Sequence, residues 1–331
     1  MSELRQDITS GDWVIIAPGR AKRPIFLDKK KKPRTPAPKS ICPFENLKES
    51  GNWPPIIAYP NEKNWQIVLL KNKYPALTHR NIRHAVSSRR GIYRHEAGVG
   101  YHDLVITRDH NKNFADLSPA MAAKLFDIFQ ERHRMMAKDS CNAYVSTFYN
   151  WGQLAGASIG HPHYQILALP IVPPHIVHSL AGSKAYFKKN HRCVRCDILH
   201  EEHKHKHRII AENEFAIAFT PYASKNPFEV SVFPKPHMSA FSETPPDVLH
   251  GAATLLQFVL RRVTTCVNDP DLNFFIHGAP LDHGKYFYHH WNIEIVPRIS
   301  LFGGFEYSTE IDINIVDPDI AAAILRGESR I

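Results

Sequence analysis

The chain has 331 residues, of which 43% are hydrophobic and 22% charged, values ordinary for a globular protein large enough to hold two domains. The opening residues form no apolar leader and no run approaches the length of a membrane span, so we expect no membrane partner. A formal charge of +9 favours anionic partners such as nucleotides or sugar phosphates, and without a nucleic-acid-binding signature we expect no nucleic acid.

The five cysteines are too few for a disulfide framework in a chain of this length. An odd count that includes one Cys-x-x-Cys fits the reduced cytoplasm and a metal site better. Near the N-terminus, segment 29–39 (KKKKPRTPAPK) has no apolar periodicity, which predicts a mobile loop. The sequence CPFE follows and contributes Cys42 and Glu45 to the candidate metal ligands.

The first predicted run of strand, turn and helix begins at His102. A β-rich segment (HDLVITRDH) leads through a turn to His110, and Ser118-Pro119 then opens a helix with proline at its first position. Met121, Leu125 and later apolar residues recur near helical spacing and mark the buried face.

The next predicted strand, in the segment SIGHPHYQILALP (158–170), carries His161, His163 and Gln165 at alternate positions. A strand turns alternate side chains to one face, so these three point together, and Tyr164 points to the other face and the core. They form either a solvated edge or a nucleophile or metal site on a rigid strand. Prolines break the strand after Leu169.

A second run repeats this pattern further along the chain. Its strand begins at Glu229, His237 follows a turn, Thr244-Pro245 opens a helix, and a last strand follows His290. The offsets agree, since 237 − 110 and 290 − 163 are both 127. We therefore predict an α+β fold of two similar halves, 1–171 and 172–331, each an antiparallel sheet with a long packed helix.

The second half carries the stronger candidate metal site. Cys193 and Cys196 (CVRC) supply two thiolates, and with His237 and His290 they form the donor set of a closed tetrahedral Zn²⁺ site. A redox pair or two buried thiols are the alternatives. The histidine-rich segment 200–208 is a rival ligand source, but its mixed glutamates and lysines predict a solvated loop.

The first half has the matching positions in weaker form. Cys42, Glu45, His110 and His161 would make a set of one thiolate, one carboxylate and two imidazoles. Either this set binds a second Zn²⁺, or His110 and Glu45 hold the same geometry through a hydrogen bond.

Together these motifs resemble the galactose-1-phosphate uridylyltransferase family of the histidine-triad superfamily. The resemblance rests on HPHYQ (161–165), FYNWG (148–152), WVIIAP (13–18), RAKRP (20–24), NKYPAL (72–77) and GGFE (303–306), which follow in the family's order. The second metal set resembles the branch that includes plant ADP-glucose phosphorylase. Glu45 departs from the pattern by replacing a common zinc cysteine, and Tyr164 is bulkier than the residue often found there.

The resemblance implies nucleotidyl transfer in two steps, with His163 as the nucleophile and the backbone carbonyl of His161 as its support. Gln165 and Ser158 would contact the phosphoryl group, and Asn72 the nucleoside. The other substrate-binding positions implied are Arg20, Lys22 and Arg23 for the phosphates, Asn150 in the FYNWG stretch, and Gly303 and Glu306 in the hexose loop.

We expect a cytoplasmic, homodimeric uridylyltransferase of galactose metabolism that acts on UDP-glucose and a hexose 1-phosphate. The alternative is a phosphorylase that uses inorganic phosphate on ADP-glucose or a dinucleoside polyphosphate. A zinc-stabilised nucleotide-binding protein without turnover, and a nucleic-acid-binding zinc protein, are readings of a different class.

Overall fold

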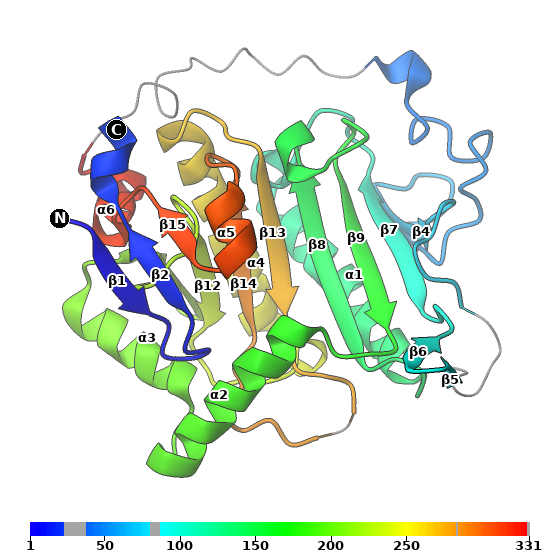
Figure 1. Ribbon diagram of the computed structural model, residues 1–331. Helices are drawn as coiled ribbons and strands as arrows, with labels where there is room; N and C mark the ends of the chain where they lie inside the picture. The colour runs from blue at the N-terminus through cyan, green and yellow to red at the C-terminus, as the bar shows by residue number, and fades with distance from the viewer. Residues whose placement is uncertain (23–37, 80–86, 283, 330–331) are drawn as a thin grey trace.

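The computed structural model describes residues 1–22, 38–79, 87–282 and 284–329 (Figure 1). The predicted loop 29–39 lies almost entirely outside these residues. A ten-stranded sheet with antiparallel neighbours forms the frame, in the order β10-β11-β12-β14-β13-β8-β9-β7-β4-β3. Its strands are β3 (Ile57–Tyr59), β4 (Ile67–Lys71), β7 (Tyr101–Thr107), β8 (Tyr144–Trp151), β9 (His163–Leu169), β10 (Ile209–Glu212), β11 (Ala216–Phe219), β12 (Val230–Pro234), β13 (Leu272–His277) and β14 (Asn292–Pro297).

Helices cover the two faces of this sheet unequally. The long helices α1 (Pro119–Ala137) and α4 (Pro246–Cys266) pack against each other behind the sheet in the view of Figure 1. The front carries α2 (Pro174–Asn190), α3 (Val194–His205), α5 (Gly304–Thr309) and a small sheet of β1 (Glu3–Gln6), β2 (Trp13–Ile16) and β15 (Asp312–Asn314). The remaining elements are a hairpin of β5 (Ser87–Arg90) and β6 (Tyr93–Glu96), and α6 (Pro318–Arg326), which packs on α4. The predicted α+β class is confirmed.

The main core lies between the sheet and α1 and α4. Tyr164 is fully buried there and contacts the rings of Phe129 and Tyr149, which confirms that strand alternation turns it away from the motif histidines. The opposite face of β4 and β7 is covered by a smaller cluster that includes Phe44 and Trp65. The segment that carries the CPFE sequence is thereby packed against the same sheet face as His163.

Only one of the two predicted helix starts is correct in detail. Ser118 caps α1, because its side chain accepts a hydrogen bond from Met121 N, and Pro119 is the first helical residue. In the second half the helix begins one residue later than predicted, at Pro246. The Thr244 hydroxyl instead donates to the Ala240 carbonyl in the preceding turn, so Thr244 does not cap α4.

A reciprocal pair of buried glutamines relates the two parts of the chain. Gln130 of α1 donates to the carbonyls of Phe241 and Thr244, and Gln257 of α4 donates to the carbonyls of Phe114 and Leu117. The two glutamines are 127 positions apart, and so are the residues whose carbonyls they bond, since 257 − 130, 241 − 114 and 244 − 117 are all 127. The offset read from the sequence therefore holds for the helices and the turns before them.

The same offset fails on the last strand of the repeat. Leu104 pairs with Gln165 between β7 and β9, and Ser231 pairs with Glu294 between β12 and β14. Ser231 follows Leu104 by 127 residues, but Glu294 follows Gln165 by 129. His290 is therefore equivalent to His161, and Asn292 to His163, so the predicted equivalence of His163 and His290 is wrong by two residues.

Further predictions concern the segment between the two halves and the histidine-rich segment that follows. Strand β9 ends at Leu169 and α2 begins at Pro174, where prolines were expected to break the strand. Because β8 of one half pairs with β13 of the other, the sheet is continuous, and the division into 1–171 and 172–331 stays a prediction. Most of the histidine-rich segment 200–208 belongs to helix α3 rather than to a loop, although His203 and His205 are exposed as expected.

We expect the free energy of unfolding to fall when the pH drops below about 6.5, because of the buried His133. Burial lowers the pKa of this histidine from 6.5 to about 3 in the folded chain, where its Nε2 lies 2.7 Å from Thr147 Oγ1. Between these two values the unfolded chain binds the extra proton, so stability is complete above pH 6.5 and is lost on acidification. One such histidine contributes a slope of up to about 1.4 kcal/mol per pH unit.

Urea unfolding at several pH values should show a shallower slope in His133→Gln, whose amide still reaches Thr147. The exposed His200→Gln on α3 serves as the matched control and should leave the slope unchanged. Equal slopes in the wild type and His133→Gln would contradict the assignment.

Among the described residues, no helix has the length and apolarity needed to cross a membrane.

Candidate active site and metal sites

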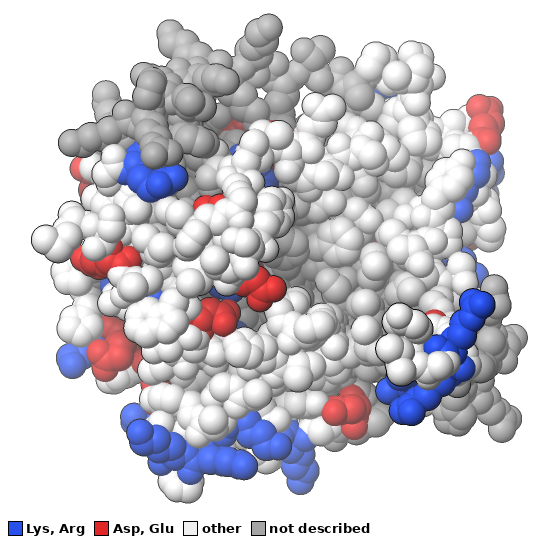
Figure 2. All heavy atoms as spheres, viewed as in Figure 1, with Lys and Arg blue, Asp and Glu red and all other residues white. Residues whose placement is uncertain are grey.

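The HPHYQ motif lies where β9 begins, on the front sheet face that the long helices leave open. Figure 2 views this face and shows a hollow near its centre. His163 is the first residue of β9 and is 6% exposed, and its Nδ1 lies 2.9 Å from the backbone oxygen of His161. Because a carbonyl oxygen only accepts hydrogen bonds, Nδ1 carries the proton and Nε2 keeps its lone pair. The geometry leaves one ring nitrogen of His163 free to act as a nucleophile.

Burial also keeps this imidazole neutral. Desolvation lowers the pKa of His163 below its ordinary 6.5, and the hydrogen bond to the His161 carbonyl only partly offsets it. The ring of Phe44 packs edge-on at 5.3 Å between centroids and helps exclude water. At neutral pH the side chain is therefore in the form that can attack an electrophilic phosphorus.

Gln165 and Asn72, which the sequence places 93 positions apart (165 − 72), meet at a residue that sequence reasoning missed. His102 Nε2 lies 2.9 Å from Gln165 Oε1 and 3.1 Å from Asn72 Nδ2. The signal was available in the alternation of β7, where His102, Leu104 and Ile106 share a face. It could be used only once β7 was known to pair with β9.

The FYNWG stretch ends β8, and its asparagine is held from the second half of the chain. Asn273 of β13 donates to Asn150 Oδ1 at 2.7 Å and to the Ala155 carbonyl at 2.9 Å. The backbone turns sharply between them, with Gly152 and Gly156 at φ of 88° and 85°. Ser158 follows in this loop and is exposed.

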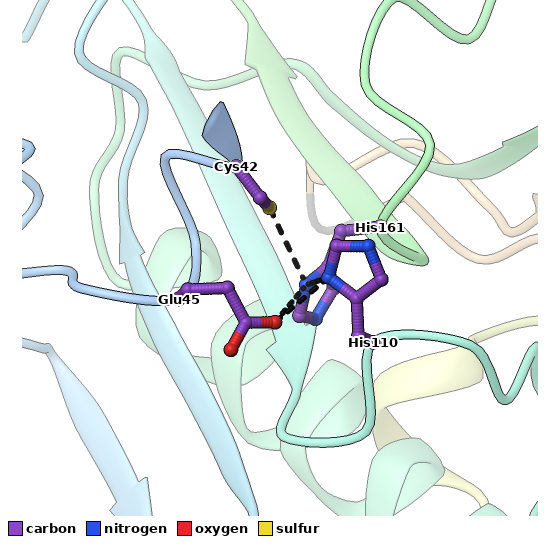
Figure 3. Close-up of side chains that lie close together, drawn as sticks. All are labelled: Cys42, Glu45, His110 and His161. Carbon is purple, nitrogen blue, oxygen red and sulfur yellow. Dashed lines mark hydrogen bonds and ion pairs between the residues drawn. The ribbon is translucent and has the colours of Figure 1, made fainter. Parts of the chain in front are cut away.

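Four side chains of the first candidate metal set converge beside the motif (Figure 3). Cys42 and Glu45 come from the segment after the 3-10 helix Lys39–Ile41, His110 follows β7, and His161 precedes β9. The ligand atoms of all four lie within 4.8 Å of one another. Both predicted alternatives remain compatible with this, because His110 Nδ1 also lies 2.7 Å from Glu45 Oε1.

The orientation of His161 fits a metal ligand. Its Nε2 lies 2.7 Å from the Thr107 carbonyl, so Nε2 donates and Nδ1 presents a lone pair to the cluster. Ligands of a tetrahedral zinc ion lie about 3.3–3.6 Å apart. His161 Nδ1 is 3.2 Å from His110 Nδ1, 3.6 Å from Cys42 Sγ and 3.6 Å from Glu45 Oε1. The three contacts of His161 are thus close to the spacing of zinc ligands, whereas the His110–Glu45 contact of 2.7 Å is shorter.

The second set gathers where α3 begins. The ligand atoms of Cys193, Cys196 and His237 lie within 4.8 Å of one another, and Cys196 Sγ is 3.2 Å from His237 Nδ1 and 3.7 Å from His290 Nδ1. The hydrogen bond from Cys196 lowers the pKa of Cys193 to about 4 and raises that of Cys196. The lowered pKa of Cys193 favours its thiolate, which is the form that binds zinc. By contrast, burial raises the pKa of Cys42.

Other predicted substrate residues lie apart from this centre. Arg20 is exposed in the 3-10 helix Pro18–Lys22, which also contains Lys22, and Arg23 lies outside the described residues. Gly303 and Glu306 lie where α5 begins, and Glu306 Oε2 accepts the Gly303 N–H at 2.8 Å. In the sheet, β13 and β8 separate β14 from β9, and Figure 1 draws α5 in front of β13 and β14. Within this chain the structure does not bring Glu306 into contact with His163.

The corresponding face of the second half is built differently. A cavity of about 1170 Å³ lies there, and its lining includes Asn292, Glu294 and Asn150, but neither His163 nor Gln165. By strand register, Asn292 lies at the position of His163 and Glu294 at the position of Gln165. These two positions of the second half therefore lack the imidazole and the glutamine amide of the HPHYQ motif.

The chain is similar to known proteins over most of its length. Residues 66–326 match a family model described as a domain of unknown function, DUF4921. The chain is 35% identical to ADP-glucose phosphorylase of Arabidopsis thaliana over 332 residues, 99% of this chain and 93% of that protein. It is 26% identical to galactose-1-phosphate uridylyltransferase of Thermotoga maritima, with 98% of each covered. A solved structure of the Arabidopsis thaliana ADP-glucose phosphorylase with bound ADP-glucose superposes with a TM-score of 0.84, at 32% identity and 99% coverage of both chains.

Proposed function

The chain belongs to the DUF4921 domain family and, like ADP-glucose phosphorylase, to the galactose-1-phosphate uridylyltransferase family, and from this premise we propose that it transfers nucleotidyl groups through a covalent nucleotidyl-histidine. The observation that carries the proposal is the hydrogen bond of 2.9 Å between His163 Nδ1 and the His161 carbonyl. It leaves Nε2 of a buried, neutral imidazole as the attacking atom.

In the first step, His163 Nε2 attacks the α-phosphorus of a nucleotide sugar. The bond from phosphorus to the bridging oxygen breaks, the sugar 1-phosphate leaves, and a phosphorus–nitrogen bond forms. In the second step, a phosphate oxygen of the acceptor attacks the same phosphorus and releases the histidine. Nδ1 keeps its proton on the His161 carbonyl throughout, so that carbonyl stabilises the positive charge that develops on the ring.

The remaining predicted residues bind and orient the substrates. Gln165 lies on the same strand face as His163, and its amide is proposed to donate to a phosphoryl oxygen, together with the Ser158 loop. Asn72 is proposed to contact the nucleoside. The other proposed substrate-binding positions are Arg20, Lys22, Arg23, Asn150, Gly303 and Glu306.

Zinc is proposed at both clusters, as a structural ion. Cys193, Cys196, His237 and His290 would form the closed site of the second half, and Cys42, Glu45, His110 and His161 the site beside the motif. An ion on His161 would stiffen the residue whose carbonyl orients His163. The five cysteines, all within the described residues, form no disulfide, which supports the proposed cytoplasmic location. A homodimer is proposed as the assembly.

Two substrate pairs fit this chemistry. The first is UDP-glucose with a hexose 1-phosphate such as galactose 1-phosphate, which fits the family. The second is ADP-glucose with inorganic phosphate, favoured by the 35% identity to ADP-glucose phosphorylase over 99% of the chain. A dinucleoside polyphosphate is a further adenine donor for the same phosphorylase chemistry. All use the same attack by His163, so the motif does not distinguish them.

A matrix of donors and acceptors tests the proposal directly. UDP-glucose and ADP-glucose are each mixed with galactose 1-phosphate, glucose 1-phosphate or inorganic phosphate, and products are separated by ion-exchange chromatography. We expect ping-pong kinetics and exchange of label between donor and sugar 1-phosphate without an acceptor. A chain that binds these nucleotides but forms no product and no acid-labile adduct would be a non-catalytic nucleotide-binding protein.

A further inference from the structure

His102 lies near the start of β7 and contacts both predicted nucleotide-binding segments. Its Nε2 is 2.9 Å from Gln165 Oε1 in the motif strand. Its Nδ1 accepts the Ala76 N–H at 3.0 Å, and its Nε2 lies 3.1 Å from Asn72 Nδ2 in the NKYPAL turn. One imidazole thus joins β9 to a turn that is about 90 residues distant in sequence (165 − 76 = 89).

The backbone contact determines the tautomer of this ring. An amide N–H is always a donor, so Nδ1 must hold its lone pair, and a neutral ring then carries its proton on Nε2. That proton is donated to the oxygen of Gln165. The Gln165 amino group takes no part in this contact and can donate to a ligand.

The same reasoning applies to Asn72. Its Oδ1 accepts the Tyr74 N–H at 3.0 Å, so the atom facing His102 is the amino nitrogen. Since Nε2 of His102 is already a donor, the Asn72 amino group finds no acceptor there and stays available to a ligand. The ring therefore leaves two amide donors, one on each segment, for an anionic or polar substrate group.

We propose that His102 is a positioning residue that fixes the Gln165 amide with its amino group toward the transferred phosphoryl group and couples it to the nucleoside turn. This inference rests on the proposed function. The equivalent positions of the second half support it, because 102 + 127 is Glu229 and 165 + 129 is Glu294. The buried Glu229 and the partly exposed Glu294 replace His102 and Gln165 there, so that half lacks the amide donor as well as the imidazole of His163.

Two substitutions separate the two contacts of the ring. Asparagine at His102 can still accept the Ala76 N–H but is too short to reach Gln165, whereas glutamine places its amino group near the former Nε2. We expect H102N to slow nucleotidylation of His163 about 10- to 100-fold in single-turnover assays. Nucleotide affinity measured on the His163→Asn background should change less than about 3-fold, and H102Q should recover most of the rate.

A double-mutant cycle tests whether His102 acts through Gln165. H102N should add little to the loss caused by Q165A, because the group it positions is already absent. The partly exposed His250 on α4 lies outside the motif and the Asn72 turn, so His250→Asn is the control and should react at the wild-type rate. The proposal would be overturned if the rate losses of H102N and Q165A multiplied in the double variant. A wild-type rate for H102N, or a rate for H102Q no faster than that of H102N, would also overturn it.

The protonation of the His102 imidazole distinguishes failure of this inference from failure of the proposed function. Nitrogen-15 NMR of His102 should show the proton on Nε2, and Q165A should shift that signal, whether or not the chain turns over. A proton on Nδ1 would overturn the positioning role even in an active enzyme. A wild-type chain without any adduct would instead refute the covalent mechanism.

Discussion

Replacing His163 with asparagine is expected to abolish the covalent nucleotidyl-enzyme while leaving nucleotide binding nearly intact. The amide has a similar size and can keep the hydrogen bond to the His161 carbonyl, but it lacks a nucleophilic nitrogen lone pair. Turnover should fall by several orders of magnitude, as when other enzymatic nucleophiles are removed. Intact-protein mass spectrometry after mixing with the donor measures the adduct, and isothermal titration measures binding.

The wild type should carry at most one nucleotidyl group per chain, since Asn292 occupies the equivalent position of the second half. The exposed His178→Asn is the matched control and should form the adduct at the normal rate. Near-normal turnover of His163→Asn, or a second modified histidine in the wild type, would remove the basis for the mechanism.

The second large effect is expected at the metal site of the second half. Replacing both Cys193 and Cys196 with serine should remove one zinc ion per chain, because a hydroxyl is a poor substitute for a thiolate ligand. Since a closed site couples metal binding to folding, the melting temperature should fall by roughly 5–15 °C. Elemental analysis and thermal unfolding with and without a chelator measure the two effects.

Serine at Cys141 and Cys266 makes a matched double variant, because neither cysteine forms a disulfide and both lie outside the two clusters. It should keep its zinc and its melting temperature to within a few degrees. If Cys193→Ser/Cys196→Ser retained full zinc and unchanged melting, the proposed ligand set would be incorrect. If zinc were lost only when Glu45 or Cys42 is replaced, the ion would lie at the first cluster instead.

Local patterns in the sequence were enough to predict several features. The Ser118-Pro119 start of α1 depends on one turn of backbone and its cap. The burial of Tyr164 follows from the two-residue alternation of a strand, and the close approach of Cys193 and Cys196 from their spacing. The offset of 127 read from the sequence also relates Gln130 to Gln257, although only the structure showed that these two glutamines bond reciprocally.

Pairing over long distances was decided only by the tertiary structure. The register of β14 differs from the repeat by two residues, which makes Asn292 rather than His290 the counterpart of His163. The equal spacing from histidine to proline in the two strands could not reveal this shift. The register of β14 depends instead on which residues of β12 and β13 lie opposite its own residues. Helix α3 also replaced an expected loop, since charge composition alone does not prevent a helix that packs one side against β11.

The sequence by itself determined the α+β class, the strand that carries the HPHYQ motif and the family to which the chain belongs. Each of these follows from short motifs whose chemistry depends on neighbours within a few residues. The structure alone decided that His102 joins Gln165 to the Asn72 turn, and that Asn273 of the other half holds Asn150. Those contacts depend on the order and register in which strands distant in sequence pair. The sequence near a side chain does not reveal them, because the hydrogen bonds that orient it come from the neighbouring strand.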